Sequence, residues 1–198
     1  MKEKIILASG SPRRKQLLEW AEVPFEIVVR ETAETYPADM AIGDIPVYIA
    51  RQKALAVKAA LSENNPSGTA DVPILAADTV VVLEDRIIGK PADKADAVRT
   101  LLALSGRNHQ VITGVVICYG NREIAFQETT EVRFHPLSRD QIEYYVEKYQ
   151  PYDKAGAYAI QEWIGVTGIA AVKGDFYNVM GLPVSRVVQA LKDLFSAR

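Results

Sequence analysis

The first place in the sequence with residues suited to chemistry is "LASGSPRRKQLL", residues 7–18, where three cations follow Ser11 and Pro12. Ser11 is a typical helix N-cap and Pro12 is favoured at the first helical position. Arg13, Arg14 and Lys15 therefore fall in the first turn of a predicted helix. That helix end already carries partial positive charge. The cluster indicates either a bound anion, such as a polyphosphate, or a solvated basic turn.

The second place is Lys53, in the segment "DIPVYIARQKALAVKAAL". On a helix, its neighbours three, four and seven positions away are all apolar: Pro46, Ile49, Ala50, Ala56, Val57 and Ala60. Lys53 is therefore predicted to point into an apolar arc. A lysine there either extends its ammonium to the rim or needs a partner, and a phosphate or a carboxylate would serve.

The third place is Asp78, in the middle of "ILAADTVVV". A carboxylate in a buried strand is costly unless it is hydrogen-bonded, paired with a cation or bound to a metal. The alternative is an aspartate that caps a turn at the end of a strand, but three valines continue the apolar run. In a regular strand Asp78 and Thr79 point to opposite faces, so both reach one site only if the strand twists or ends there.

The fourth place is Lys90, in "IIGKPAD". Gly89 and Pro91 are predicted to hold it on a tight turn shortly after the Asp78 strand. Taken alone, this pattern is typical of a surface turn. Together with Asp78 and Lys53 it adds another cation to the same predicted site.

The composition excludes several classes of function. The chain has 198 residues, 48% of them hydrophobic and 24% charged, which predicts an ordinary globular protein of one or two domains. A net charge of −2 gives no global attraction to nucleic acid or to a membrane surface, so neither is expected as a partner. The two histidines, His109 and His135, lack metal-ligand spacing and offer no order typical of a Ser/His/Asp triad.

The cellular location is predicted from the cysteine count and the N-terminus. Cys118 is the single cysteine, so no internal disulfide is possible, and it is expected to pack as a small hydrophobic residue. The apolar run in "MKEKIILASG" is too short for a signal peptide, and no segment reaches membrane-spanning length. A cytoplasmic location is therefore expected.

Strands and helices are predicted to alternate along the chain and to position these residues. The expected strands are 4–9, 25–29 and 72–83, a hairpin over 109–134 that turns at Gly120-Asn121, and a strand near 168–174. The expected helices are 12–22, 45–61, 94–104, 138–149 capped by Ser138, and 183–195, with a loop at 64–68. This alternation predicts a mixed α/β fold.

Six segments together resemble the Maf family of nucleoside triphosphate pyrophosphatases. They are "LASGSPRRKQLL", "ARQKA", "AADTVV", "GKPAD", "LSGRNHQVITGV" and "YDKAGAYAIQ", and the family order continues to "NVMGLP" at 178–183. The resemblance implies one ITPase-like α/β domain over 1–198, with a mixed sheet and two lobes around a central cleft, commonly as a homodimer. It also implies a divalent metal, Mg²⁺ or Mn²⁺, and cleavage between the α- and β-phosphates to a monophosphate and pyrophosphate.

The resemblance also implies a role for single residues. The positions that match phosphate-contacting residues of the family are Ser11, Arg13, Arg14, Lys53 and Lys90. Asp78 matches the proton acceptor, and it would share the metal with an acidic residue that follows the second strand. Glu31 and Glu34 both stand there, and the spacing favours Glu34. Magnesium is typically held by one or two carboxylates plus substrate phosphates, which agrees with these roles.

Three positions resemble the subgroup of the family that acts on dTTP and UTP rather than on 7-methyl-GTP. They are Arg13, Thr79 and Gln161. A glutamine amide can donate to O4 of uracil or thymine and accept from N3–H, whereas cytosine presents the reversed pattern. The resemblance therefore implies a nucleotide-pool cleaning enzyme that prefers dTTP and UTP, including modified pyrimidine nucleotides.

A second function class stays open at this point. The family name refers to septum formation, which implies as an alternative a non-catalytic nucleotide-binding regulator of cell division that acts through a protein partner. Asp78 argues against it, because binding a polyanion gains nothing from a carboxylate in an apolar strand.

Overall fold

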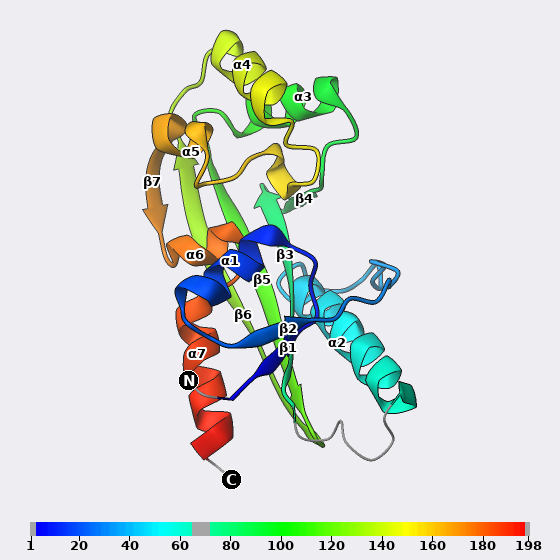
Figure 1. The fold of residues 1–198 in the computed structure, drawn as a ribbon. Coiled ribbons are helices and arrows are strands. Elements are labelled where there is room, and N and C mark those ends of the chain that lie inside the picture. Colours follow the sequence, from blue (N-terminus) through cyan, green and yellow to red (C-terminus); the bar gives the residue numbers. More distant parts are fainter. Residues whose placement is uncertain (1–2, 65–71, 197–198) are drawn as a thin grey trace. The chain divides into compact units, whose positions relative to one another are not determined.

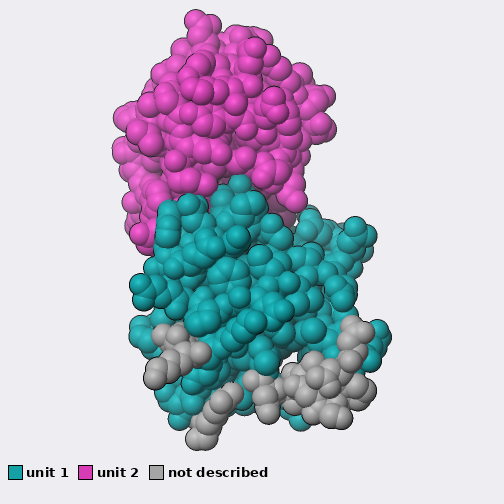
Figure 2. Space-filling model, viewed as in Figure 1, with its two compact units in different colours: residues 1–78, 113–128, 181–198 teal, residues 79–112, 129–180 magenta. Residues whose placement is uncertain are grey.

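The computed structural model describes residues 3–64 and 72–196, and these residues form a mixed sheet of seven strands flanked by helices (Figure 1). The chain divides into two compact units, coloured in Figure 2. Unit 1 comprises residues 1–78, 113–128 and 181–198, and unit 2 comprises residues 79–112 and 129–180. The mixed α/β fold predicted from the alternation is confirmed, whereas the central cleft stays a prediction.

The strands follow the order β2-β1-β3-β5-β6-β7, with β4 paired to β3. Their bounds are β1 Ile5–Leu7, β2 Phe25–Ile27, β3 Ile74–Leu83, β4 Arg86–Ile88, β5 Asn108–Tyr119, β6 Arg122–Phe134 and β7 Ile169–Lys173. β1 pairs in parallel with β2 and with β3, while β3–β4 and β6–β7 are antiparallel. Parallel neighbours need crossover connections, which here carry the helix Pro12–Trp20 between β1 and β2 and the helix Ile45–Asn64 between β2 and β3.

In unit 1, the helices are α1 Pro12–Trp20, α2 Ile45–Asn64 and α7 Val184–Ser196. Figure 1 shows α2 and α7 on opposite sides of the strands. Ala50, Ala54 and Val57 of α2 pack against one face of the sheet in a buried cluster. The sheet contributes Ile6, Ala8, Ile74, Ala76, Val116 and Cys118 to that cluster. Because strand side chains alternate, Ile5, Leu7 and Leu75 are buried on the other face.

In unit 2, the helices are α3 Lys94–Leu104, α4 Arg139–Tyr149, the 3₁₀ turn η2 Ala155–Ala157, α5 Trp163–Gly168 and α6 Phe176–Met180. α3 packs against α4. A second buried cluster joins Val81, Val111 and Val132 of three strands. α4 begins with a full capping box in which Ser138 and Gln141 exchange bonds, as the predicted cap requires.

The long elements agree with the sequence predictions, and the departures have local causes. The first helix was expected to reach Glu22 but ends at Trp20, because Glu22 adopts a left-handed φ of 53°. The predicted loop at 64–68 begins on the last residue of α2, and its remainder lies outside the described residues. Cys118 is buried as expected.

The sequence patterns did not predict β4 or the short helices α5 and α6. The turn between β3 and β4 is formed by Glu84 and Asp85, both with positive φ (48° and 60°). Such turns usually carry Asn or Gly, so "LEDRII" gave no hairpin signal. The segment "IIGKPAD" is therefore not a turn throughout, because its first two residues belong to β4. Over the described residues, no helix is long and apolar enough to cross a membrane.

Candidate functional site

The basic segment lies where β1 passes into α1, and its first feature is the cap. The Ser11 hydroxyl accepts from the Arg14 backbone N–H at 3.5 Å, which is the weak end of a hydrogen bond, and Pro12 opens the helix. The Ser11 backbone N–H donates to the Ser9 hydroxyl at 3.3 Å. The predicted cap and first turn are confirmed, and Arg13 lies half-buried in that turn.

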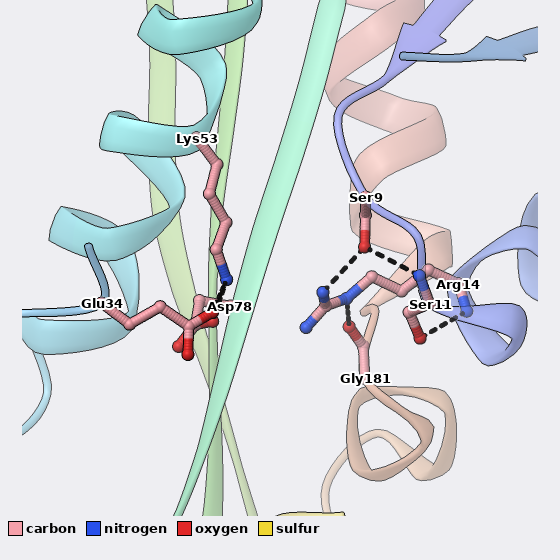
Figure 3. Close-up of polar contacts among 7 residues, drawn as sticks. All are labelled: Ser9, Ser11, Arg14, Glu34, Lys53, Asp78 and Gly181. Carbon is pink, nitrogen blue, oxygen red and sulfur yellow. Dashed lines mark hydrogen bonds and ion pairs between the residues drawn. The ribbon is translucent and has the colours of Figure 1, made fainter. Parts of the chain in front are cut away.

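Arg14 is fixed by two partners (Figure 3). Its Nε donates to the Gly181 carbonyl at 2.8 Å, and its Nη1 donates to the Ser9 hydroxyl at 3.0 Å. Neither partner was predicted from the sequence. Burial lowers the pKa of Arg14, while the carboxylates of Asp78 and Glu34 act in the opposite direction. An arginine stays protonated even when its pKa is lowered by burial. Arg14 is therefore a fixed cation within electrostatic range of two carboxylates.

Lys53, Glu34 and Asp78 form the second group in Figure 3. The ammonium of Lys53, on α2, lies 2.7 Å from Asp78 Oδ1 on β3 and 2.7 Å from Glu34 Oε1 in the segment before α2. The side chains of Lys53 and Asp78 are only 17% and 14% exposed, while Glu34 is 50% exposed. The prediction that Lys53 needs a charged partner is confirmed, and the partners are carboxylates.

Asp78 lies in a strand that does not end there. β3 continues through Thr79 to Leu83, so the strand-end reading of Asp78 is wrong. Asp78 and Thr79 are the two half-buried positions in an otherwise buried strand. The ion pair with Lys53 compensates the carboxylate inside the strand, as its burial requires.

The pair of carboxylates suits a divalent cation. Glu34 and Asp78 direct one oxygen each at the same ammonium, so a single cation already contacts both. Over residues 3–64 and 72–196, no group of three or more His, Cys, Asp and Glu side chains gathers to hold a metal. Two protein carboxylates, completed by phosphate oxygens and water, are the donor set that magnesium typically uses, so these residues fit the expected metal.

The remaining predicted residues lie in unit 2. Lys90 is exposed just after β4, where the Gly89 carbonyl accepts from the Gly156 N–H at 3.2 Å. Gln161 is exposed between η2 and α5.

Within unit 1, the structure brings Arg14 within electrostatic range of Glu34 and Asp78.

The histidines have no place in this chemistry. His109 is buried, its Nε2 lies 2.7 Å from the Tyr158 hydroxyl, and its ring stacks on Phe134 at a centroid distance of 5.5 Å. Burial lowers the pKa of His109 to about 4, so the ring is neutral at physiological pH. His135 is exposed. His109 therefore has a structural role in unit 2.

The chain is similar to known proteins over nearly its whole length. A dTTP/UTP pyrophosphatase of Cytophaga hutchinsonii is 50% identical over 192 residues, which are 97% of this chain and 84% of that protein. A dTTP/UTP pyrophosphatase of Parabacteroides distasonis is 46% identical over 96% of both chains. Among solved structures, the Staphylococcus aureus Ham1 protein aligns with a TM-score of 0.44 and 13% identity, over 67% of this chain and 72% of that one. Residues 4–194 match the family described as Maf-like protein. Because this match and the two similar pyrophosphatases cover nearly the whole chain, the chain belongs to the Maf family.

Proposed function

We propose that this chain is a nucleoside triphosphate pyrophosphatase that hydrolyses dTTP and UTP to the monophosphate and pyrophosphate, and so removes nucleotides from the cellular pool. Family membership and the names of the similar proteins support this activity. The observation that carries it is the contact of Lys53 with both Glu34 and Asp78, within electrostatic range of Arg14. This arrangement combines anions for a metal with cations for a polyphosphate.

The cations serve to bind and polarise the phosphates. The residues proposed to contact phosphate oxygens are Ser11, Arg13, Arg14, Lys53 and Lys90. Arg14 is held rigidly by Ser9 and Gly181, so little side-chain entropy is lost when it binds a phosphate. Fixed cations beside the leaving group stabilise the charge that develops on pyrophosphate.

Asp78 is the proposed proton acceptor. A carboxylate held in place by Lys53 can orient a water molecule and take its proton as the water attacks the α-phosphate. Glu34 and Asp78 would hold Mg²⁺ or Mn²⁺, which when bound supplies positive charge to the phosphate oxygens.

Base selection is proposed to rest on Arg13, Thr79 and Gln161. The Gln161 amide can donate to O4 and accept from N3–H of uracil or thymine, and cytosine reverses both groups. A site with such a pair of polar groups rejects the mismatched base, because the groups are left unpaired. Neither Thr79 nor Gln161 is proposed to recognise the 2′-hydroxyl of the sugar. The ribose and deoxyribose forms of the substrate should therefore both react.

The proposal includes a homodimer that acts in the cytoplasm. Both features come from the family resemblance. Light scattering on the purified chain, with and without nucleotide, tests the homodimer by its mass. Imaging of the tagged chain in cells tests its location.

The activity is tested by incubating the purified chain with Mg²⁺ and each canonical triphosphate, and separating the products by chromatography. We expect dTMP and UMP with pyrophosphate, and much less product from dCTP, dATP and GTP. Diphosphate with orthophosphate would contradict the proposed bond, and equal rates on all substrates would contradict the specificity. Binding without any turnover would favour the non-catalytic regulator instead.

A further inference from the structure

Gln161 is exposed on a turn that follows two buried residues and precedes the half-buried Glu162. Ala159 is 4% exposed and Ile160 is 3% exposed, and Glu162 follows at the start of α5. An exposed side chain meets a ligand in one orientation only if the backbone beneath it is held in one conformation. The contacts that hold this turn come from within unit 2.

Tyr145 of α4 holds the turn on both sides of Gln161. The Tyr145 side chain is fully buried, and its hydroxyl donates to the Glu162 carboxylate. The same hydroxyl accepts from the Ala159 backbone N–H at 3.2 Å. One phenol oxygen therefore bonds the chain two residues before Gln161 and one residue after it.

The other oxygen of the Glu162 carboxylate also has a partner. Lys154 Nζ lies 3.7 Å from Glu162 Oε1 and 2.7 Å from Asp153 Oδ1, and the Lys154 side chain is only 11% exposed. Glu162 is thus contacted from two directions, by the phenol and by the ammonium. A carboxylate held this way keeps one rotamer, which makes it a firm anchor for the backbone at residue 162.

The backbone of the turn is closed by its own contacts. The Glu162 N–H donates to the Ala159 carbonyl at 3.1 Å, and the Gly165 N–H donates to the Glu162 carbonyl at 2.9 Å. A Cβ on Gly165 would lie 1.8 Å from the Ile160 carbonyl oxygen, so the first turn of α5 packs directly on Ile160. The turn has no room to shift toward the helix.

From these contacts we infer that Tyr145 is a positioning residue for base selection: its hydroxyl fixes the backbone around Gln161 so that the amide meets the pyrimidine in one orientation. This inference rests on the proposed function, in which Gln161 reads the base. Tyr145 acts through the turn and is not itself in contact with the nucleotide. Its loss should therefore weaken recognition of the preferred base while leaving the chemical step intact.

The test is Tyr145→Phe, assayed with Mg²⁺ on dTTP and on dCTP. The variant keeps the buried ring and removes both hydrogen bonds of the hydroxyl. We expect the KM for dTTP to rise roughly five- to tenfold, the scale of one lost hydrogen bond. We expect kcat for dTTP to stay within about twofold and kcat/KM for dCTP to change little, so that the preference for dTTP falls by the same factor.

The matched control is Tyr144→Phe, the same change at the neighbouring position of α4. The Tyr144 hydroxyl accepts from Lys148 at 2.9 Å on the exposed side, so its loss should leave both constants at wild-type values. Glu162→Leu is the second variant, because it removes the acceptor and leaves Tyr145 in place, and it should raise the same KM. Glu162→Gln keeps an acceptor carbonyl for Tyr145 and should lie nearer to the wild type.

The outcomes separate this inference from the proposed function. If the wild type prefers dTTP but Tyr145→Phe and Glu162→Leu leave the dTTP to dCTP ratio unchanged, the positioning role is overturned and the function stands. Equal loss of kcat on both substrates would also overturn it, since that is a structural effect. A wild type with no preference for dTTP would overturn the base selection itself, and with it the inference.

Discussion

Lys53 Nζ and Asp78 Oδ1 lie 2.7 Å apart and come from residues 25 positions apart in the sequence. Both side chains are more than four-fifths buried, so each charge depends on the other for compensation. Glu34 shares the same ammonium. A single lysine therefore contacts the two carboxylates that are proposed to bind metal and to accept a proton. Substitutions of these residues can separate effects on nucleotide or metal binding from effects on turnover.

Asp78→Asn should lower turnover of dTTP by roughly 10²-fold or more, the usual effect of removing a positioned base. The amide keeps the shape of the side chain but cannot accept the proton. Nucleotide binding should survive, because Arg13, Arg14 and Lys53 remain. Steady-state kinetics with a binding isotherm measure both. Asp193→Asn on the exposed face of α7 is the control, and near-normal turnover in Asp78→Asn would remove Asp78 from the mechanism.

Lys53→Gln should strengthen the binding of Mn²⁺ in the absence of nucleotide. The ammonium and the metal compete for the same oxygens of Glu34 and Asp78, and an uncharged amide competes less. We expect about tenfold tighter binding, the scale of one charge-assisted hydrogen bond. Free Mn²⁺ is measured by electron paramagnetic resonance.

The control for this metal titration is Lys58→Gln, which removes a charge from the same helix. The Lys58 ammonium donates to the Gly120 carbonyl at 2.8 Å, away from both carboxylates. Its affinity for Mn²⁺ should equal that of the wild type. Unchanged or weaker Mn²⁺ binding in Lys53→Gln would show that the two carboxylates do not hold the metal.

Gln161→Glu should reduce the preference for dTTP over dCTP by roughly tenfold or more, because a carboxylate cannot donate to O4 of thymine. Competition between the two substrates in one reaction measures the ratio of kcat/KM directly. Gln189→Glu, a position on α7, introduces the same charge and should leave the ratio unchanged. An unaltered ratio in Gln161→Glu would contradict its role in base selection.

His109 should make the free energy of unfolding depend on pH between about 4 and 6.5. Burial lowers the pKa of His109 to about 4 in the folded chain, while the unfolded chain titrates near 6.5. In that window the unfolded state binds more protons, so stability falls as the pH is lowered from about 6.5 and levels off below about 4. The total loss from this group is about 3 kcal/mol.

Urea unfolding of the wild type and His109→Gln at several pH values isolates this contribution. The glutamine amide keeps a polar group near the Tyr158 hydroxyl, and it does not titrate. The difference in stability between the two proteins should therefore change across the window. His135→Gln, at the exposed histidine, is the matched control for the loss of an imidazole. Parallel curves for His109→Gln and the wild type would contradict the prediction.

The sequence by itself determined the features that depend on near neighbours. Ser11 and Pro12 set the start of α1, and the residues of α3 and the two-residue turn of the β5–β6 hairpin follow from local periodicity and turn chemistry. The apolar residues around Lys53 on its own helix are enough to predict that its ammonium needs a charged partner. These signals act over one or two turns of chain, so they do not depend on where distant segments lie.

Only the tertiary structure decided which partners meet. Lys53 contacts both Glu34 and Asp78. Arg14 donates to a carbonyl 167 residues away, and the Tyr145 hydroxyl bonds the chain on both sides of Gln161. The turn before β4 was also not predicted from the sequence. Glu84 and Asp85 adopt positive φ there because β3 and β4 pair on either side of them. Each of these contacts depends on how the chain crosses the sheet. A local sequence pattern does not report the distance between residues that lie far apart in the chain and meet only in the folded structure.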